Sequence, residues 1–229
     1  MVKHLFTSEK LSVQVHPTDE QARAMGLVGG KSECWFITEV TDDATIGIGL
    51  QEVMTADTLL AAALDGSIEQ ALVWHKAEVG QCWWIPAGTI HAIGPGVTLI
   101  EVQQNNDITY RLYDYGRPRE LHLDAAVAVA RAEPYDLSLC TRRDGAATWL
   151  SRNRYFDLLY FTGSGVAEAK AALTRDALVI TLGHELRVGC AQLPPGSAAW
   201  VSDTADFALA ENGEALLALP TCRSTRFDA

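Results

Sequence analysis

The chain has 229 residues, 48% of them hydrophobic, which suffices for one large or two small domains with a buried core. Its formal net charge of -11 disfavours nucleic acids and anionic membranes as partners, although a few local cations can still hold a small anion. No run approaches the roughly 18 apolar residues of a membrane span, and the first residues lack the order of a signal peptide. A cytoplasmic protein is therefore expected.

The cysteines indicate a reducing environment. Their odd number and the lack of a C-x-x-C pair argue against a disulfide framework or a cysteine-based zinc site. We expect reduced, mostly buried thiols at all five positions: Cys34, Cys82, Cys140, Cys190 and Cys222.

The first candidate ligands lie in a short alternating stretch. Residues 11–17 (LSVQVHP) alternate as a strand does, so that Ser12, Gln14 and His16 share one face. A short helix is expected over residues 17–26, with Thr18 as its N-cap. A second strand over residues 31–37 then carries a carboxylate, Glu33, near its start.

Further strands and helices are expected before the middle of the chain. Residues 44–50 read as a strand. Residues 55–64 and 67–74 read as two short helices, each with a hydroxyl residue as its cap.

The central hairpin is the most informative stretch. Residues 82–85 form a short apolar run between Gly80 and a Pro-Ala-Gly turn, which favours a strand, and a returning strand follows over residues 97–102. His91 lies three residues after that turn. Because neighbouring strand residues face opposite ways, we expect Trp83 in the core and Trp84 partly exposed. The spacing Gly, five residues, Pro-x-Gly, two residues, His resembles a signature of the cupin barrels, in which that histidine binds a metal.

The rest of the chain predicts a second β-rich part. Residues 105–115 return towards the barrel mouth, and Asp124 is expected to cap a helix that ends near residue 131. Strands are expected over residues 155–162, 178–182, 188–193, 198–201 and 215–219. Ala199 stands where a repeated hairpin would carry its histidine, so this part is expected to be a degenerate, metal-free barrel. We therefore divide the chain into a metal-binding domain (residues 1–132), a linker (133–148) and the degenerate domain (149–229).

Four side chains form the candidate ligand set: Gln14, His16, Glu33 and His91. Two imidazole nitrogens and two oxygens suit Zn, with Mn or Fe as alternatives, and one ion per chain is expected. Each residue alone is more often an ordinary hydrogen-bonded group, and the grouping is what favours a metal. The other histidines are expected to be structural.

The motifs LSVQVHP, GKSECWF, IPAGTIHAIGPG, EVQQNNDITYRLYDYGR and RELHLD resemble those of the type I phosphomannose isomerases. These are zinc cupins that interconvert mannose 6-phosphate and fructose 6-phosphate, and the resemblance covers about residues 3–129. It implies a mainly β jelly-roll barrel with a few short helices, a second cupin-like half and a small phosphorylated sugar as substrate. Members of the family usually carry a longer segment before the first motif, so we expect either that the start of the chain is misassigned or that the protein is a shortened relative with an incomplete barrel wall and weaker activity.

The resemblance also implies roles for single residues. Gln14, His16, Glu33 and His91 match the metal ligands. Positions of the active site match Arg111, Lys31, Glu101 and Asp107, and positions that hold the phosphate match Ser12 and Lys3.

Isomerisation through an enediol fits these residue types, because it needs a cation to stabilise an oxyanion and a base to carry a proton. Arg111 is permanently cationic and suits an oxyanion or phosphate. Glu101, Asp107 and Lys31 stay open as the base, and Asp107 with Arg111 could also form an ordinary surface ion pair.

Two other functions stay open from the sequence. One is a cupin that holds a metal and binds or senses sugars without turnover. The other is a different cupin enzyme, such as an iron-dependent oxygenase. The oligomeric state is not predicted.

Overall fold

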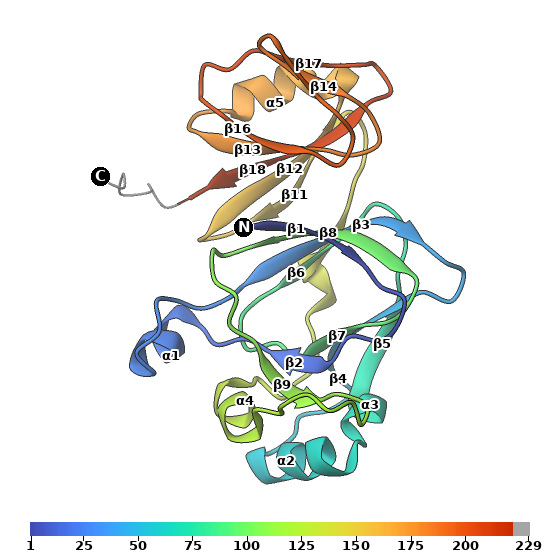
Figure 1. Ribbon diagram of the computed structural model, residues 1–229, viewed down its shortest axis with the longest axis vertical. Coiled ribbons are helices and arrows are strands. Elements are labelled where there is room, and N and C mark those ends of the chain that lie inside the picture. Colours follow the sequence, from blue (N-terminus) through green and yellow to red (C-terminus); the bar gives the residue numbers. More distant parts are fainter. Residues whose placement is uncertain (222–229) are drawn as a thin grey trace. The chain divides into compact units, whose positions relative to one another are not determined.

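The computed structural model describes residues 1–221 and is mainly β, as the sequence predicts (Figure 1). The chain divides into two compact units, Met1–Cys140 and Thr141–Ala229. Within the described residues, no helix is both long and apolar enough to span a bilayer.

Two five-stranded sheets build the first unit. One has the strand order β1-β8-β3-β6-β10, and the other has the order β5-β4-β7-β2-β9. The strands are β1 (Val2–Phe6), β2 (Val13–Val15), β3 (Glu33–Val40), β4 (Thr45–Leu50), β5 (Leu72–Lys76), β6 (Gln81–Ile85), β7 (His91–Ile93), β8 (Val97–Gln103), β9 (Tyr110–Tyr113) and β10 (Cys140–Arg142).

Apolar side chains from the two sheets form one core cluster. Trp35 and Trp83 come from the first sheet, and Ile46 and Ile48 come from the second. Trp83 is 3% exposed and Trp84 is half-buried, which confirms the expected alternation of the two indoles.

Short helices cover the other face of the second sheet (Figure 1). Leu59 of α2 and Val129 of α4 pack with Val13 and Val15 of β2 in a second apolar cluster. This face is therefore closed, so the face of β2 that carries Gln14 is turned towards the first sheet. The covering helices are α2 (Ala56–Asp65), α3 (Ile68–Ala71) and α4 (Leu123–Val129), while α1 (Asp19–Ala24) lies apart from them.

Two of the four predicted helix caps are confirmed by side-chain bonds. Thr18 closes a capping box with Gln21, and the Thr55 side chain accepts from the backbone N–H of Thr58. Ser67 is also the N-cap residue of its helix, as predicted, but its side chain makes no cap bond, and the Asp124 cap is wrong because Asp124 lies inside the first turn of α4.

The helix expected over residues 67–74 is also wrong in its second half. The chain leaves α3 after Ala71 and enters β5, which pairs with β4. Strand β1 was not predicted. It runs antiparallel to β8, with Lys3 opposite Glu101.

The second unit has a five-stranded sheet (β11-β12-β18-β13-β16) and a three-stranded one (β15-β14-β17). Its core includes Phe161, Val179, Phe207 and Leu217. The strand predicted over residues 188–193 is instead a hairpin that turns at Gly189 (φ 56°). The elements after β10 are β11 (Ala147–Arg152), β12 (Phe156–Thr162), α5 (Val166–Ala172), β13 (Ala177–Thr181), β14 (Leu186–Val188), β15 (Ala191–Leu193), β16 (Ala198–Val201), β17 (Phe207–Leu209) and β18 (Glu214–Pro220), with short 3-10 turns η1 (Leu137–Leu139) and η2 (Gly163–Gly165).

Within residues 1–221, the cysteines form no disulfide, as expected. Cys34 and Cys82 are buried, Cys140 is half-buried and Cys190 is exposed. Cys222 lies outside the described residues.

Candidate metal centre

Three neighbouring strands of the second sheet place candidate side chains in one row. Gln14 of β2 lies opposite His91 of β7 on one side and opposite Arg111 of β9 on the other. Directly opposite residues of antiparallel strands share a face of the sheet. His16 follows two residues after Gln14, at the end of the same strand.

The first sheet contributes acidic and basic side chains. On its neighbouring strands, Glu33 lies opposite Gln103, while Lys3, Glu101 and Trp35 form the adjacent row. The candidate residues therefore come from both sheets and meet between them.

Three of the four predicted ligands form a compact buried group. One ligand atom each from His16, Glu33 and His91 lies within 4.8 Å of the others. The Nε2 atoms of His16 and His91 are each 3.5 Å from a different oxygen of Glu33, and all three side chains are at most 1% exposed. Such a group can hold a metal ion.

The hydrogen bonds of the imidazoles support this interpretation. The Nδ1 atom of His16 lies 2.8 Å from the carbonyl of Ile108, and Nδ1 of His91 lies 2.9 Å from the carbonyl of Thr89. A carbonyl can only accept, so each Nδ1 donates to it, and the Nε2 atom of each ring is the one that can bind a cation when the imidazole is neutral. Glu33 Oε2 accepts no well-aligned hydrogen bond within residues 1–221 and has the cationic Lys31 Nζ at 3.0 Å as an ion-pair partner, which also fits a carboxylate that can coordinate a cation.

Gln14 completes the predicted set. Its Nε2 atom lies 3.3 Å from His91 Nε2, and its Oε1 atom accepts from the Ser12 hydroxyl at 3.3 Å. Rotation of the amide by 180° exchanges its two terminal atoms, which would turn the oxygen towards the imidazoles. The side chain therefore lies where an amide oxygen could join the other ligands.

Lys31 lies among the acidic residues of the centre. Its Nζ is 3.0 Å from Glu33 Oε2 and 3.8 Å from Glu101 Oε1. Burial opposes ionisation of Glu33, but the charges of His16 and Lys31 outweigh it and hold the pKa of Glu33 far below its usual range. Glu33 is therefore an anion at neutral pH, as a metal ligand must be.

Glu101 has the opposite shift. Burial, and next the negative charge of Glu33, raise its pKa to about 7, although Lys31 and Lys3 lie nearby. A carboxyl with this pKa exchanges its proton near neutral pH. A divalent cation at the three ligands would add positive charge and lower this pKa.

Asp107 and Arg111 do not pair with each other. The exposed Asp107 accepts from Lys3 Nζ at 2.6 Å, and this bond lowers its pKa. Arg111 donates to the carbonyl of Glu120 at 3.4 Å. The alternative of a simple i, i+4 ion pair is therefore wrong.

Trp35 is a member of the site that sequence reasoning missed. Its indole N–H lies 3.0 Å from Glu33 Oε1 and 3.3 Å from Glu101 Oε2, so it can donate to both carboxylates. The signal was present, because Trp35 lies two residues after Glu33 and therefore on the same face of the strand.

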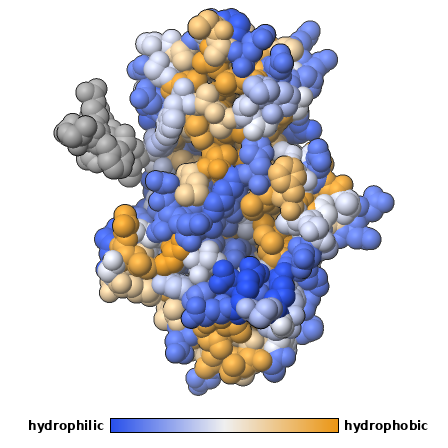
Figure 2. Space-filling view, in the orientation of Figure 1, coloured by the Kyte–Doolittle hydropathy of each residue, from blue (hydrophilic) through white to orange (hydrophobic). Residues whose placement is uncertain are grey.

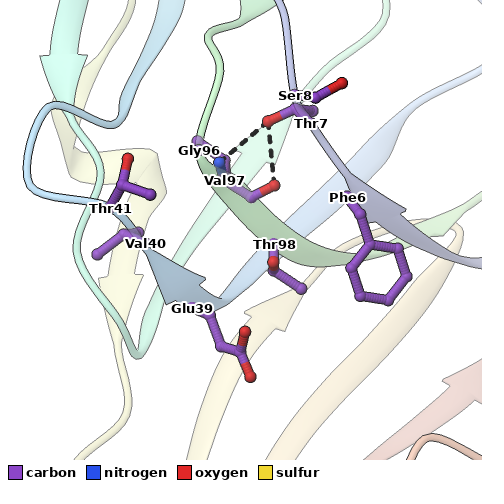
Figure 3. A pocket seen from close by; sticks show the side chains of 9 residues that line it. All are labelled: Phe6, Thr7, Ser8, Glu39, Val40, Thr41, Gly96, Val97 and Thr98. Atoms are coloured by element: carbon purple, nitrogen blue, oxygen red, sulfur yellow. Dashed lines mark hydrogen bonds between the residues drawn. The ribbon is translucent and has the colours of Figure 1, made fainter.

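Two hollows of the first unit are lined by residues other than the four candidate ligands. One, of about 300 Å³, lies where β1 and β3 end and β8 begins, at the opposite end of these strands from Glu33 and Gln103 (Figure 3). Phe6, Thr98 and Glu39 line it from three adjacent strands. The other, of about 210 Å³, is lined by Pro86, Thr89, Arg131, Glu133, Pro134, Tyr135, Asp136 and Leu139.

Comparison with known proteins places these observations in a family context. No family model matches the chain. The mannose-6-phosphate isomerase ManA of Bacillus subtilis is 41% identical over 137 residues, which is 56% of this chain and 43% of that protein. The mannose-6-phosphate isomerase of Streptococcus mutans is 34% identical over 151 residues, or 61% of this chain and 48% of that protein.

Over about 60% of its length, the chain is similar in sequence to curated mannose-6-phosphate isomerases. This relation confirms the resemblance seen in the motifs. The chain spans about half the length of the curated isomerases it matches.

Solved structures of isomerases share the fold. The mannose 6-phosphate isomerase of Bacillus subtilis superposes with a TM-score of 0.72 at 24% identity, covering 95% of this chain and 74% of that one. A variant of the Salmonella typhimurium phosphomannose isomerase gives 0.69 at 15% identity, covering 96% and 79%. The predicted cupin fold, mainly β with a few short helices, is thereby confirmed.

Proposed function

We propose that the chain is a metal-dependent isomerase that interconverts mannose 6-phosphate and fructose 6-phosphate. The observation that carries the proposal is the convergence of His16, Glu33 and His91 from two sheets on one point, beside Lys31 and Glu101. The names of the relatives supply the substrate.

We propose Zn²⁺ as the resident ion, held by His16, Glu33, His91 and the amide oxygen of Gln14, because two imidazoles and two oxygens suit zinc. Mn²⁺ and Fe²⁺ are the alternatives. When bound, the cation supplies Lewis acidity that polarises a carbonyl or stabilises an oxyanion.

Glu101 is the best suited of the three candidate bases. Isomerisation takes a proton from C2 of the aldose and returns one to C1, so the carrier must both accept and donate near neutral pH. In the metal-free protein, burial and the charge of Glu33 raise the pKa of Glu101 to about 7, so this carboxyl starts from a higher basicity than an exposed one before the cation lowers its pKa. Asp107 is exposed and its pKa is lowered by Lys3, so it is a weaker base.

Lys31 and Arg111 supply fixed positive charge around the reacting atoms. Lys31 Nζ lies 3.4 Å from His16 Nε2, so its ammonium can donate to a substrate oxygen beside the ligands. Arg111 shares the face of Gln14 and His91 and presents a planar fork of donors. Both charges would stabilise an enediolate oxygen.

Lys3 and Ser12 are proposed to hold the phosphate. Lys3 is partly exposed and lies at the edge of the centre, 3.6 Å from Glu101. Ser12 is 3% exposed and lies beside Gln14. An ammonium and a hydroxyl are suitable donors for a phosphate monoester.

The test is a coupled assay for fructose 6-phosphate formed from mannose 6-phosphate. We expect turnover that chelation removes and that added Zn²⁺ restores. His91→Ala should lose both metal and turnover, while His4→Ala, which changes an exposed residue of β1, should keep both.

Other outcomes would support other functions. Bound sugar phosphate without turnover would support a cupin that binds or senses sugars. Bound iron with oxygen consumption would support an oxygenase.

A further inference from the structure

We infer that Asp114 is a positioning residue that fixes the Arg111 side chain through the segment that follows β9. The inference rests on the proposed role of Arg111 and adds to it a residue without a predicted role. It is carried by the contacts of residues 111–122.

Arg111 lies on a strand that needs support from outside the sheet. In the order β5-β4-β7-β2-β9, strand β9 is at the edge and pairs with β2 alone. That pairing also has an irregular register between Val13 and Gln14. An edge strand of four residues has little else in the sheet to fix its position.

The returning chain supplies the missing contacts. The backbone N–H of His122 donates to the carbonyl of Arg111 at 2.9 Å, and His122 Nδ1 accepts from the N–H of Arg111 at 3.3 Å. The guanidinium donates to the carbonyl of Glu120 at 3.4 Å. Both backbone polar groups of Arg111 and its side chain are therefore held by residues 120–122.

The turn between β9 and this segment has an unfavourable backbone conformation. Tyr115 has φ 55° and Gly116 has φ 76°, so two consecutive residues adopt the left-handed conformation. For a bulky residue such as tyrosine this backbone is unfavourable and persists only where its surroundings impose it.

Asp114 binds across this turn. Its side chain is 1% exposed and accepts from Arg117 Nη2 and from Arg119 Nε and Nη2, each at 2.6 Å. Burial opposes its ionisation, but bonds from Arg119 and Arg117 hold the pKa of Asp114 below its usual value. The carboxylate thus binds both arginines of the segment that leads to Glu120 and His122.

The surface around the turn offers a matched control. Arg117 also pairs with Glu9 at 3.1 Å, but the Glu9 side chain is 74% exposed. In Figure 2, strongly hydrophilic residues cover the part of the surface where Figure 1, in the same orientation, shows β9. An exposed pair of this kind contributes little, so Glu9→Gln should leave the segment unchanged.

The first test is hydrogen exchange of the backbone amides of Arg111 and His122. We expect Asp114→Asn to speed both by about 10-fold or more, and Glu9→Gln to leave both at the wild-type rate. We call the bonds from Arg117 and Arg119 to Asp114 the Asp114 clamp. Arg119→Gln removes one arginine of this clamp at a half-exposed position and should increase both exchange rates by a smaller factor, which keeps the test valid if Asp114→Asn does not fold. Wild-type exchange in both clamp variants would overturn the inference.

The second test is a double-mutant cycle in the isomerase assay. Asp114→Asn should lower kcat/KM by about 10- to 100-fold with metal content unchanged, since misplacement of a catalytic group by about 1 Å has effects of this size. In an Arg111→Lys background the same change should lower kcat/KM less than two-fold, because the guanidinium that Asp114 positions is already absent. Full additivity would overturn the inference. A wild-type chain without turnover would refute the proposed function, while the exchange experiment would still decide the role of Asp114.

Discussion

Glu101 is a buried carboxyl whose surroundings oppose its ionisation. It is 5% exposed, its pKa is about 7, and it lies within 4 Å of two lysines. If it carries the proton, Glu101→Gln should lower kcat by at least about 100-fold, which is the usual contribution of a general base. Metal content, measured by elemental analysis, should stay at one ion per chain. Retained activity would shift the role to Lys31.

The same pKa predicts a pH-dependent stability of the metal-free protein. Between pH 4.5 and about 7, folded Glu101 keeps a proton that the unfolded chain has lost, so stability falls as the pH rises through this window. The difference is on the order of 3 kcal/mol. Urea unfolding at pH 5, 6, 7 and 8 in chelator should show that Glu101→Gln gains stability relative to wild type as the pH rises. A constant difference across this range would contradict the shift.

Sequence reasoning found the residues that a local pattern can identify. Strand alternation placed Gln14 and His16 on one face, and the turn spacing singled out His91. It did not find the Asp114 clamp, because an acidic residue with two nearby arginines is common in exposed turns. The sequence does not show which of these carboxylates becomes buried. Partners far apart in the chain, such as Lys3 and Asp107, depend on the pairing of β1 with β8.

At the scale of elements, the entry to β3 depends on one close backbone approach. A Cβ atom on Gly30 would lie 2.5 Å from Pro17 O and from Thr18 C. Lys31 N also donates to Pro17 O at 3.1 Å. The start of α1 therefore fixes where Lys31 and Glu33 enter the centre.

Gly30→Ala should disturb this approach. Because the neighbouring atoms are backbone, the two segments must separate, and we expect a loss of about 1–3 kcal/mol in stability with weaker metal binding. Gly29→Ala is the matched control, since its Cβ would meet only Asp19 Oδ1 at an ordinary 3.4 Å. Urea unfolding and metal titration of both variants provide the measurement. Equal behaviour of the two variants would show that the approach is not needed.

The elements also show where local propensity fails. Thr18 and Thr55 cap their helices because the cap bond is local. Residues 72–74 leave the helical pattern because pairing with β4 offers Leu72 and Trp74 a place in the sheet. Pairing between distant segments outweighs the small intrinsic preference for helix.

At the scale of the whole molecule, the two units differ in chemistry. The candidate ligands and the charged residues around them all lie in the unit Met1–Cys140. The core of the other unit is apolar, with Phe161, Phe207 and Leu217 among its buried residues. A bound cation should therefore act on the first unit directly.

Loading the metal-free protein with Zn²⁺ tests this difference. At a free concentration 100 times the dissociation constant, binding stabilises the folded state by about 2.7 kcal/mol, which corresponds to a rise on the order of 10 °C in the unfolding temperature of the first unit. Hydrogen exchange followed by mass spectrometry should show slower exchange in peptides from β2, β3 and β7, and unchanged exchange in those from β12 and β18. A His91→Ala variant should show neither effect. Slower exchange in β12 and β18 with no change in β3 would place the metal outside the proposed centre.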